Sequence, residues 1–185
     1  WDFDKGEKYL KHAIELNPND AFAHCHLGWL YCASLIPGTR YSRDFKIEDS
    51  FTEMKKAVEI SPTETIYQGY LAWLYNFASR FEEAINESRK TLQLDPNYTM
   101  AYFVMGSSYS EMGMHYEAIE AHKKGIAISP DYVNGLGVAY ALAGEKDKAL
   151  EIVKELEKCM DSWWCASGVA DIYSALGQKD KAIDA

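Results

Sequence analysis

Hydrophobic residues recur along most of the chain with the spacing of amphipathic helices. The segments that show this spacing are about a dozen residues long and come in pairs joined by short turns. One such pair is MGSSYSEMGMHYEAIEAHKKGIAI, residues 105–128, with Gly113 at its joint. The pattern predicts an all-α chain built of antiparallel helix hairpins.

Four similar phrases divide this pattern into repeats: ELNPND, EISPTE, QLDPNY and AISPDY. The last two intervals between their prolines are 34 residues each, and the first is 44. Aligned on the prolines, each unit shows a large apolar residue, then a glycine or alanine, and a tyrosine three residues further on. In the uninterrupted units an alanine follows nine residues after the tyrosine; these are Ala84, Ala118, Ala149 and Ala182. A fixed period of this size is typical of repeat architectures.

The repeated positions have a physical explanation. The small residues let the two backbones of a hairpin approach closely, while the tyrosine fills the space between one hairpin and the next. The proline ends the second helix, because proline cannot continue a helix. A single hairpin cannot bury its own apolar face, but stacked hairpins can. We therefore expect a right-handed superhelix of stacked hairpins, an α-solenoid.

This pattern resembles the tetratricopeptide repeat, with Leu-Gly-x-x-Tyr, an alanine nine residues later and a proline twelve residues after that. Residues 65–98 and 99–132 match it without a gap. The resemblance divides residues 1–185, as a single array, as follows: the second helix of a partial repeat (1–20), a repeat with a ten-residue insertion in its turn (21–64), two full repeats (65–98 and 99–132), a shortened repeat (133–162) and a truncated repeat (163–185).

The insertion lies within CASLIPGTRYSRDFKIEDS, residues 32–50. It is an enlarged turn inside one repeat rather than an interdomain linker. Its basic residues Arg40, Arg43 and Lys46 stand out in an acidic chain. Two interpretations remain: a loop that touches a partner, or a tolerated spacer whose charges pair with neighbouring carboxylates.

Composition narrows the function classes. The 185 residues carry a formal net charge of −9 and are 48% hydrophobic. This acidity argues against nucleic acid and against an anionic membrane surface, since both attract clustered Lys and Arg. No apolar run is long enough to span a bilayer. The four cysteines lack the dense spacing of a disulfide framework, so we expect free buried thiols and a cytoplasmic protein.

Candidate chemistry is sparse, and we predict no enzyme, no cofactor and no metal site. His24, Cys25 and His26 are adjacent, but adjacent helical residues diverge and do not converge on one ion. His115 and His122 fall at packing positions and are expected to be structural histidines with satisfied hydrogen bonds. No phosphate-binding loop, nucleophile elbow or HExxH motif occurs.

The resemblance also implies a concave groove lined by the first helix of each repeat. Transferred residue by residue, its peptide-binding positions are Phe22, His26, Trp29, Tyr70, Trp73, Asn76, Phe77, Phe103, Ser107, Glu111 and Asn134. Carboxylate clamping is not expected, because Cys25, Gly69 and Phe103 occupy the fifth position of the repeats. Large rings such as Trp29 and Trp73 are typical anchors of an interface, but they are equally typical of packing between hairpins.

We therefore expect a non-catalytic protein-protein interaction scaffold that binds a peptide or a partner helix. The alternative is a sensory or dimerisation segment of a multidomain signalling enzyme or transcription regulator. The opening and closing phrases are similar to repeat regions of bacterial and archaeal signalling proteins, and the chain begins and stops inside a hairpin. Helices without capping repeats leave self-association open as a further mode.

Overall fold

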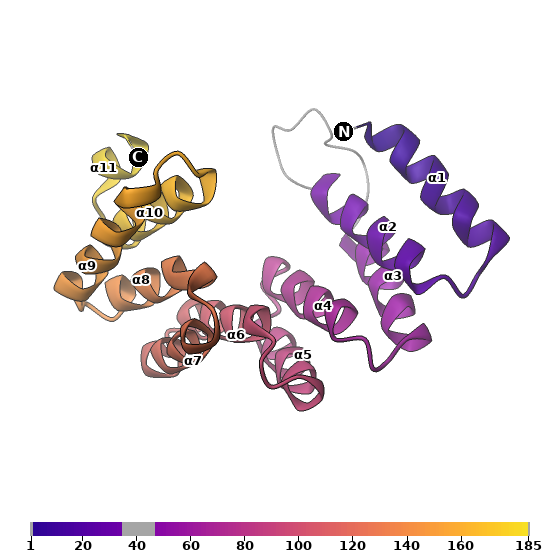
Figure 1. Cartoon of the computed structure of the whole chain (residues 1–185), viewed down its shortest axis with the longest axis horizontal. Helices are drawn as coiled ribbons and strands as arrows, with labels where there is room; N and C mark the ends of the chain where they lie inside the picture. Colours follow the sequence, from indigo (N-terminus) through magenta and orange to yellow (C-terminus); the bar gives the residue numbers. More distant parts are fainter. Residues whose placement is uncertain (1, 35–46, 185) are drawn as a thin grey trace. The chain divides into compact units, whose positions relative to one another are not determined.

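A computed structural model describes residues 2–34 and 47–184 of the chain. Within these residues it has eleven α-helices and no β-strand, which confirms the all-α prediction (Figure 1). The helices are α1 (Phe3–Leu16), α2 (Ala21–Ser34), α3 (Ile47–Ile60), α4 (Thr65–Phe77), α5 (Phe81–Leu94), α6 (Thr99–Glu111), α7 (His115–Ile128), α8 (Val133–Leu142), α9 (Lys146–Leu156), α10 (Trp163–Ala175) and α11 (Lys179–Asp184). Two 3-10 turns, Pro130–Tyr132 and Glu157–Cys159, precede α8 and α10.

The chain divides into two compact units, Trp1–Asp95 and Pro96–Ala185. In the first unit α1 packs on α2, and the hairpins α2–α3 and α4–α5 meet through α3 and α4. In the second unit the hairpins are α6–α7, α8–α9 and α10–α11, and α8 contacts both α6 and α10. Each unit is therefore a stack of helix hairpins, as an α-solenoid requires.

Each described hairpin turn contains one residue in the left-handed backbone region. These residues are Ser79, Gly113, Gly144 and Gly177, with φ between 58° and 78°. The residue after each one donates its N–H to the carbonyl of the repeat tyrosine, as Met114 does to Tyr109 at 2.9 Å. This bond satisfies a carbonyl that the helix end would leave free, so the first helix stops and the chain reverses.

The small positions of the repeat are buried where the two helices of a hairpin cross. Ala84, Ala118 and Ala149 have no exposed surface, and neither has Ser50, the equivalent residue of α3. On the opposite helix of that hairpin, a Cβ at Gly28 would lie 2.7 Å from Cγ of Met54 and 3.1 Å from the Ser50 carbonyl. The prediction that these residues allow close backbone approach is confirmed.

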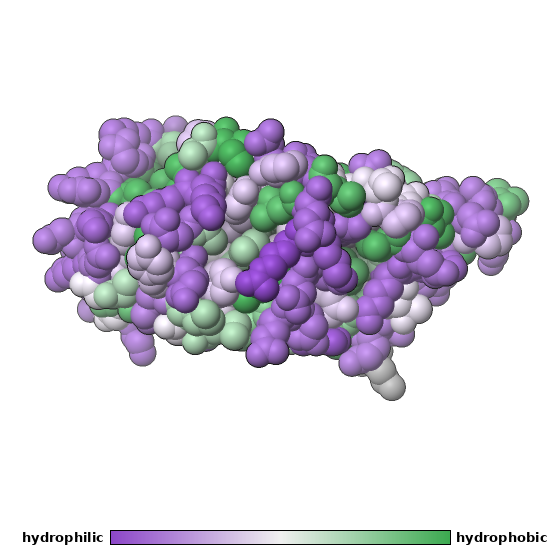
Figure 2. Space-filling view, turned by 90° about the horizontal axis from the view of Figure 1, so that it is seen from below, coloured by the Kyte–Doolittle hydropathy of each residue, from purple (hydrophilic) through white to green (hydrophobic). Residues whose placement is uncertain are grey.

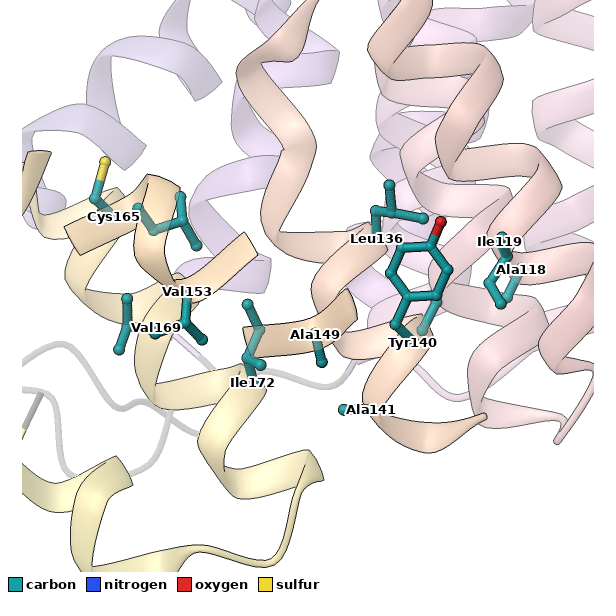
Figure 3. Close-up of a cluster of buried hydrophobic side chains, with 12 residues drawn as sticks. Ala118, Ile119, Leu136, Tyr140, Ala141, Ala149, Val153, Cys165, Val169 and Ile172 are labelled. Atoms are coloured by element: carbon teal, nitrogen blue, oxygen red, sulfur yellow. The ribbon is translucent and has the colours of Figure 1, made fainter. Parts of the chain in front are cut away.

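The core of the second unit draws side chains from four helices (Figure 3). Tyr140 of α8 lies beside Leu136 and faces Ile119 of α7, while Val153 of α9 and Ile172 of α10 fill the other side. Ile172 has no exposed surface. Because the apolar residues of one hairpin are covered by the next, the core runs continuously through the stack.

The exposed helix faces carry many ion pairs. Figure 2 shows a mainly hydrophilic face with separate hydrophobic groups. Arg80 pairs with Glu83 at 2.6 Å and Lys90 with Glu87 at 2.7 Å, in both cases between residues three apart in the chain. Exposed pairs of this kind contribute about 0–1 kcal/mol each, so they keep the face hydrated without determining the fold.

The cysteine prediction is half wrong. Cys25 and Cys32 are free and buried, and burial raises their thiol pKa values to about 12 and about 11. Cys159 and Cys165, however, form a disulfide. The turn Glu157–Cys159 and the start of α10 bring their Cα atoms to 5.9 Å, which is within disulfide range. A spacing of six residues across a loop gave no sequence signal of this proximity.

Two further expectations concern the insertion and the membrane. Arg40, Arg43 and Lys46 of the insertion lie outside the described residues. Among the helices that are described, none combines the length and apolarity needed to cross a bilayer.

Candidate functional site

The predicted groove residues all lie on the first helices of the hairpins, and they form two separate groups. In the N-terminal unit the group is Phe22, His26 and Trp29 on α2 with Tyr70, Trp73, Asn76 and Phe77 on α4. In the C-terminal unit it is Phe103, Ser107 and Glu111 on α6 with Asn134 on α8.

The N-terminal group is an aromatic cluster. The Trp29 ring lies 4.5 Å from that of Trp73 and 5.2 Å from that of Tyr70, and Trp73 stacks on Phe77 at 5.7 Å. Trp29 and Tyr70 also cover the buried pair Cys25 and Ala57. The rings thus pack on one another and on the core, yet Trp29, Tyr70 and Trp73 stay half-buried and Phe77 is exposed. These residues therefore pack against their neighbours and also keep part of their surface accessible to a partner.

The C-terminal group lines an open cavity of about 360 Å³, here called the C-terminal cavity. All four predicted residues of this unit border it, and α10 contributes Asp171. The first helices of three successive hairpins therefore face one space. The lining residues outside the predicted set are Ser110, His122, Gly135, Val138, Leu142, Asp171, Ser174 and Ala175.

His122 reaches this cavity from α7, the second helix of its hairpin. Its ring occupies a slot between two glycines: a Cβ at Gly106 of α6 would lie 2.5 Å from Nε2, and one at Gly135 of α8 would lie 2.4 Å from Cε1. The side chain is 2% exposed. Burial lowers its pKa to about 4, so the imidazole is neutral at neutral pH. The two glycines facing the histidine were visible in the sequence, but their convergence was not.

Three buried polar atoms at the cavity lack hydrogen-bond partners among the described residues. They are Nδ1 of His122, Oγ of Ser110 and Oδ1 of Asn134, each on a residue that lines the cavity and is more than nine-tenths buried. Nδ1 of His115, the first residue of α7, is also buried and has no hydrogen-bond partner among the described residues. The expectation that His115 and His122 have satisfied hydrogen bonds is therefore wrong. Buried polar atoms left unpaired are rare and are usually satisfied by a bound molecule or water.

The charge of the cavity is negative. Glu111 and Asp171 line it, and no lysine or arginine of the described chain does. Within residues 2–34 and 47–184 neither carboxylate takes part in an ion pair. Although Asp171 is exposed, desolvation by the cavity walls raises the pKa of its carboxyl group. The site thus holds carboxylates without a described cation to balance them.

Aromatic rings surround Phe103 at one side of the cavity. Its ring lies 4.9 Å from that of Tyr132, 5.8 Å from that of His122 and 6.5 Å from that of Trp164. Tyr132 and Trp164 also meet edge to face at 6.0 Å. Because each ring is held by others, Phe103 presents a rigid face to the cavity.

We expect Gly135→Ala to lower the free energy of unfolding by about 1–3 kcal/mol, because the new methyl group overlaps the enclosed His122 ring. This cost exceeds the gain of up to about 1 kcal/mol that alanine has over glycine inside a helix. Urea unfolding followed by circular dichroism measures it. In a His122→Ala background the same substitution should cost far less. Equal costs in both backgrounds would show that the ring does not fill the slot.

The residues His24, Cys25 and His26 have structural contacts in the N-terminal unit. The ring nitrogens of His24 lie 2.6 Å from Glu53 Oε2 and 3.1 Å from the Pro18 carbonyl. His26 stacks on Phe22 at 3.8 Å and hydrogen-bonds its carbonyl. Among the described residues, no three His, Cys, Asp or Glu side chains come together as a metal site would need. His24 thus links α2 to α3 and to the preceding turn, whereas these contacts of His26 lie within α2.

Comparisons with known proteins agree with this geometry. The tetratricopeptide repeat family matches residues 101–132. None of the curated proteins matches the chain significantly. Among solved structures, the crystal structure of MamA is 23% identical with a TM-score of 0.64, over 100% of this chain and 92% of that one.

Two other solved structures are similar. TTC0263, a thermophilic tetratricopeptide repeat protein of Thermus thermophilus, is 21% identical with a TM-score of 0.70, over 89% of this chain and 87% of that one. YrrB, described as having an unusual peptide-binding site, is 18% identical with a TM-score of 0.60, over 95% of this chain and 91% of that one. At these identities the likeness defines the fold. Residues 101–132 are a tetratricopeptide repeat, and the whole chain has the fold of proteins built from this repeat.

Proposed function

We propose that the chain is a protein-protein interaction scaffold that binds a peptide segment or a partner helix in the C-terminal cavity. One observation carries the proposal: the first helices of three successive hairpins line one open space whose buried polar atoms have no partner among the described residues. Such a space can orient a peptide through a few polar contacts beside an aromatic face. The peptide-binding site named for YrrB supports the same use of the fold.

The aromatic cluster of α2 and α4 is proposed as a second contact surface. Trp29, Tyr70 and Trp73 are already ordered by packing, so a partner would bind them at a low cost in side-chain entropy. Phe77, exposed at 42%, extends this surface.

The proposal contains no catalytic step, and several sequence predictions stay predictions. These are the repeat boundaries, self-association through terminal helices, the place of the chain in a signalling protein, and the absence of nucleic-acid binding. A cytoplasmic location also stays a prediction. The prediction rested on free thiols, and disulfides are rare in reducing compartments. The Cys159–Cys165 bond therefore removes part of its basis.

Filling the C-terminal cavity should weaken peptide binding there without unfolding the chain. We expect peptides selected from a random phage library on the whole chain to bind Ser107→Trp at least tenfold more weakly. Ser107 lines the cavity and is half-buried, so an indole there occupies the space of the ligand. Fluorescence anisotropy with labelled peptides measures the affinity.

The matched control is Lys123→Trp, which adds the same ring to an exposed position of α7. It should leave the affinity within twofold of the wild type. If every selected peptide bound Ser107→Trp as well as the wild type, no peptide would use the C-terminal cavity, and the proposal would be refuted.

A further inference from the structure

We infer that the C-terminal cavity accepts a positively charged side chain, lysine or arginine, of its peptide partner. This inference rests on the proposed function and specifies the chemistry of the occupant. It follows from three features of the cavity: its charge, its unpaired acceptors and its apolar wall.

The charge favours a cation and disfavours an anion. Glu111 and Asp171 reach the cavity from α6 and α10, on opposite sides of α8 in the helix stack. No basic side chain of the described residues lines the cavity, and His122 contributes no charge at neutral pH. A peptide carboxylate would meet two like charges and no such cation. A peptide cation would attract the Asp171 carboxylate and so offset the desolvation that now raises its pKa.

The hydrogen-bonding groups of the C-terminal cavity favour a ligand that donates hydrogen bonds. Asn134 Oδ1 is a buried acceptor that has no donor within the described part of the chain. The two carboxylates are acceptors as well. An ammonium group offers three donors and a guanidinium group five, and neither has an acceptor. Either would therefore pair with Asn134 and a carboxylate without leaving an unmatched lone pair of its own.

The remaining wall suits the stem of such a side chain. Val138, Leu142 and Ala175 supply apolar surface, and the aromatic side chain of Phe103 lines the same space. Lysine and arginine bury an aliphatic stem while keeping the charged end near polar groups. A cation near an aromatic ring gains further stabilisation from the ring face. A volume of about 360 Å³ falls within the range of small-ligand pockets, roughly 300–1,000 Å³.

The test uses the selected peptides and the whole chain. We expect the peptides that Ser107→Trp rejects to share one lysine or arginine, and replacing it by norleucine or citrulline to weaken binding at least tenfold. The Glu111→Gln/Asp171→Asn variant should weaken the unmodified peptide to a similar degree. The two changes together should cost little more than either alone, because both remove the same contact.

The matched control addresses the net charge of −9, which attracts cationic peptides to any acidic surface. Asp147→Asn/Glu151→Gln removes the same charge from exposed positions of α9 and should change the affinity less than twofold. Cavity-bound peptides without a shared basic residue, or with full affinity for the Glu111/Asp171 variant, would overturn the inference and leave the proposed function standing. A selection in which Ser107→Trp rejects none of the peptides would instead refute the proposed function, and the inference with it.

Discussion

Ile172→Ala is expected to lower the free energy of unfolding by about 2–5 kcal/mol. Ile172 has no exposed surface and joins the core that α7, α8, α9 and α10 build together (Figure 3). A Cβ at Gly137 would lie 2.3 Å from its Cδ1, so the side chain fits tightly against the backbone of α8. Its removal leaves a cavity that the surrounding helices cannot close without repacking. Urea unfolding followed by circular dichroism measures the loss.

Ile183→Ala is the matched control, since it deletes the same atoms from a side chain of α11 that is 82% exposed. We expect this change to alter the free energy of unfolding by less than about 0.5 kcal/mol. A loss of similar size for both variants would mean that α10 is not packed in the core as described.

The second large effect is a loss of stability in acid through His122. Its pKa is about 4 in the folded chain, against about 6.5 for an ordinary histidine. Between these values the unfolded chain binds a proton that the folded chain does not. Stability is therefore fully present above about pH 6.5 and falls as the pH drops toward 4, by about 3 kcal/mol in total.

The measurement compares urea unfolding at pH 7 and pH 4.5 for the wild type and for His122→Gln. Because all other titrating groups are shared, the difference between the two proteins isolates the imidazole. The variant should lose about 2–3 kcal/mol less than the wild type over this interval. Glu111 and Asp171 line the same cavity and would stabilise an imidazolium there, so the Glu111→Gln/Asp171→Asn background should show a loss at least as large. Equal pH dependence of the wild type and His122→Gln would contradict the burial of the ring.

Much of the fold was predictable because its determinants are local and repeated. The helix periodicity identifies each helix, and Gly113 marks a turn whose positive φ suits glycine. Ala84, Ala118 and Ala149 recur at the same distance from a tyrosine, and all three lie at helix crossings. A signal that returns several times in the same register is seldom accidental, so it predicts the pairing of helices into hairpins.

The candidate site was predicted only in part. Repeat positions indicated Phe103, Ser107, Glu111 and Asn134, because they lie on the first helix of their hairpins. They did not indicate His122, which belongs to the second helix of its hairpin and reaches the cavity where Gly106 and Gly135 leave room. For Trp29 and Trp73 they left interface contact and packing equally open, and in the other unit the two rings pack on each other.

The sequence by itself determined the helices, their pairing into hairpins and the stacking of those hairpins, since each depends on residues close together in the chain. The tertiary structure alone decided three things: the slot of His122, the Cys159–Cys165 bond, and the meeting of Glu111 with Asp171 at one cavity. Each depends on distances between side chains of different elements. A repeat determines which helix position each residue occupies. Which side chains come into contact also depends on the sizes of the side chains packed around them.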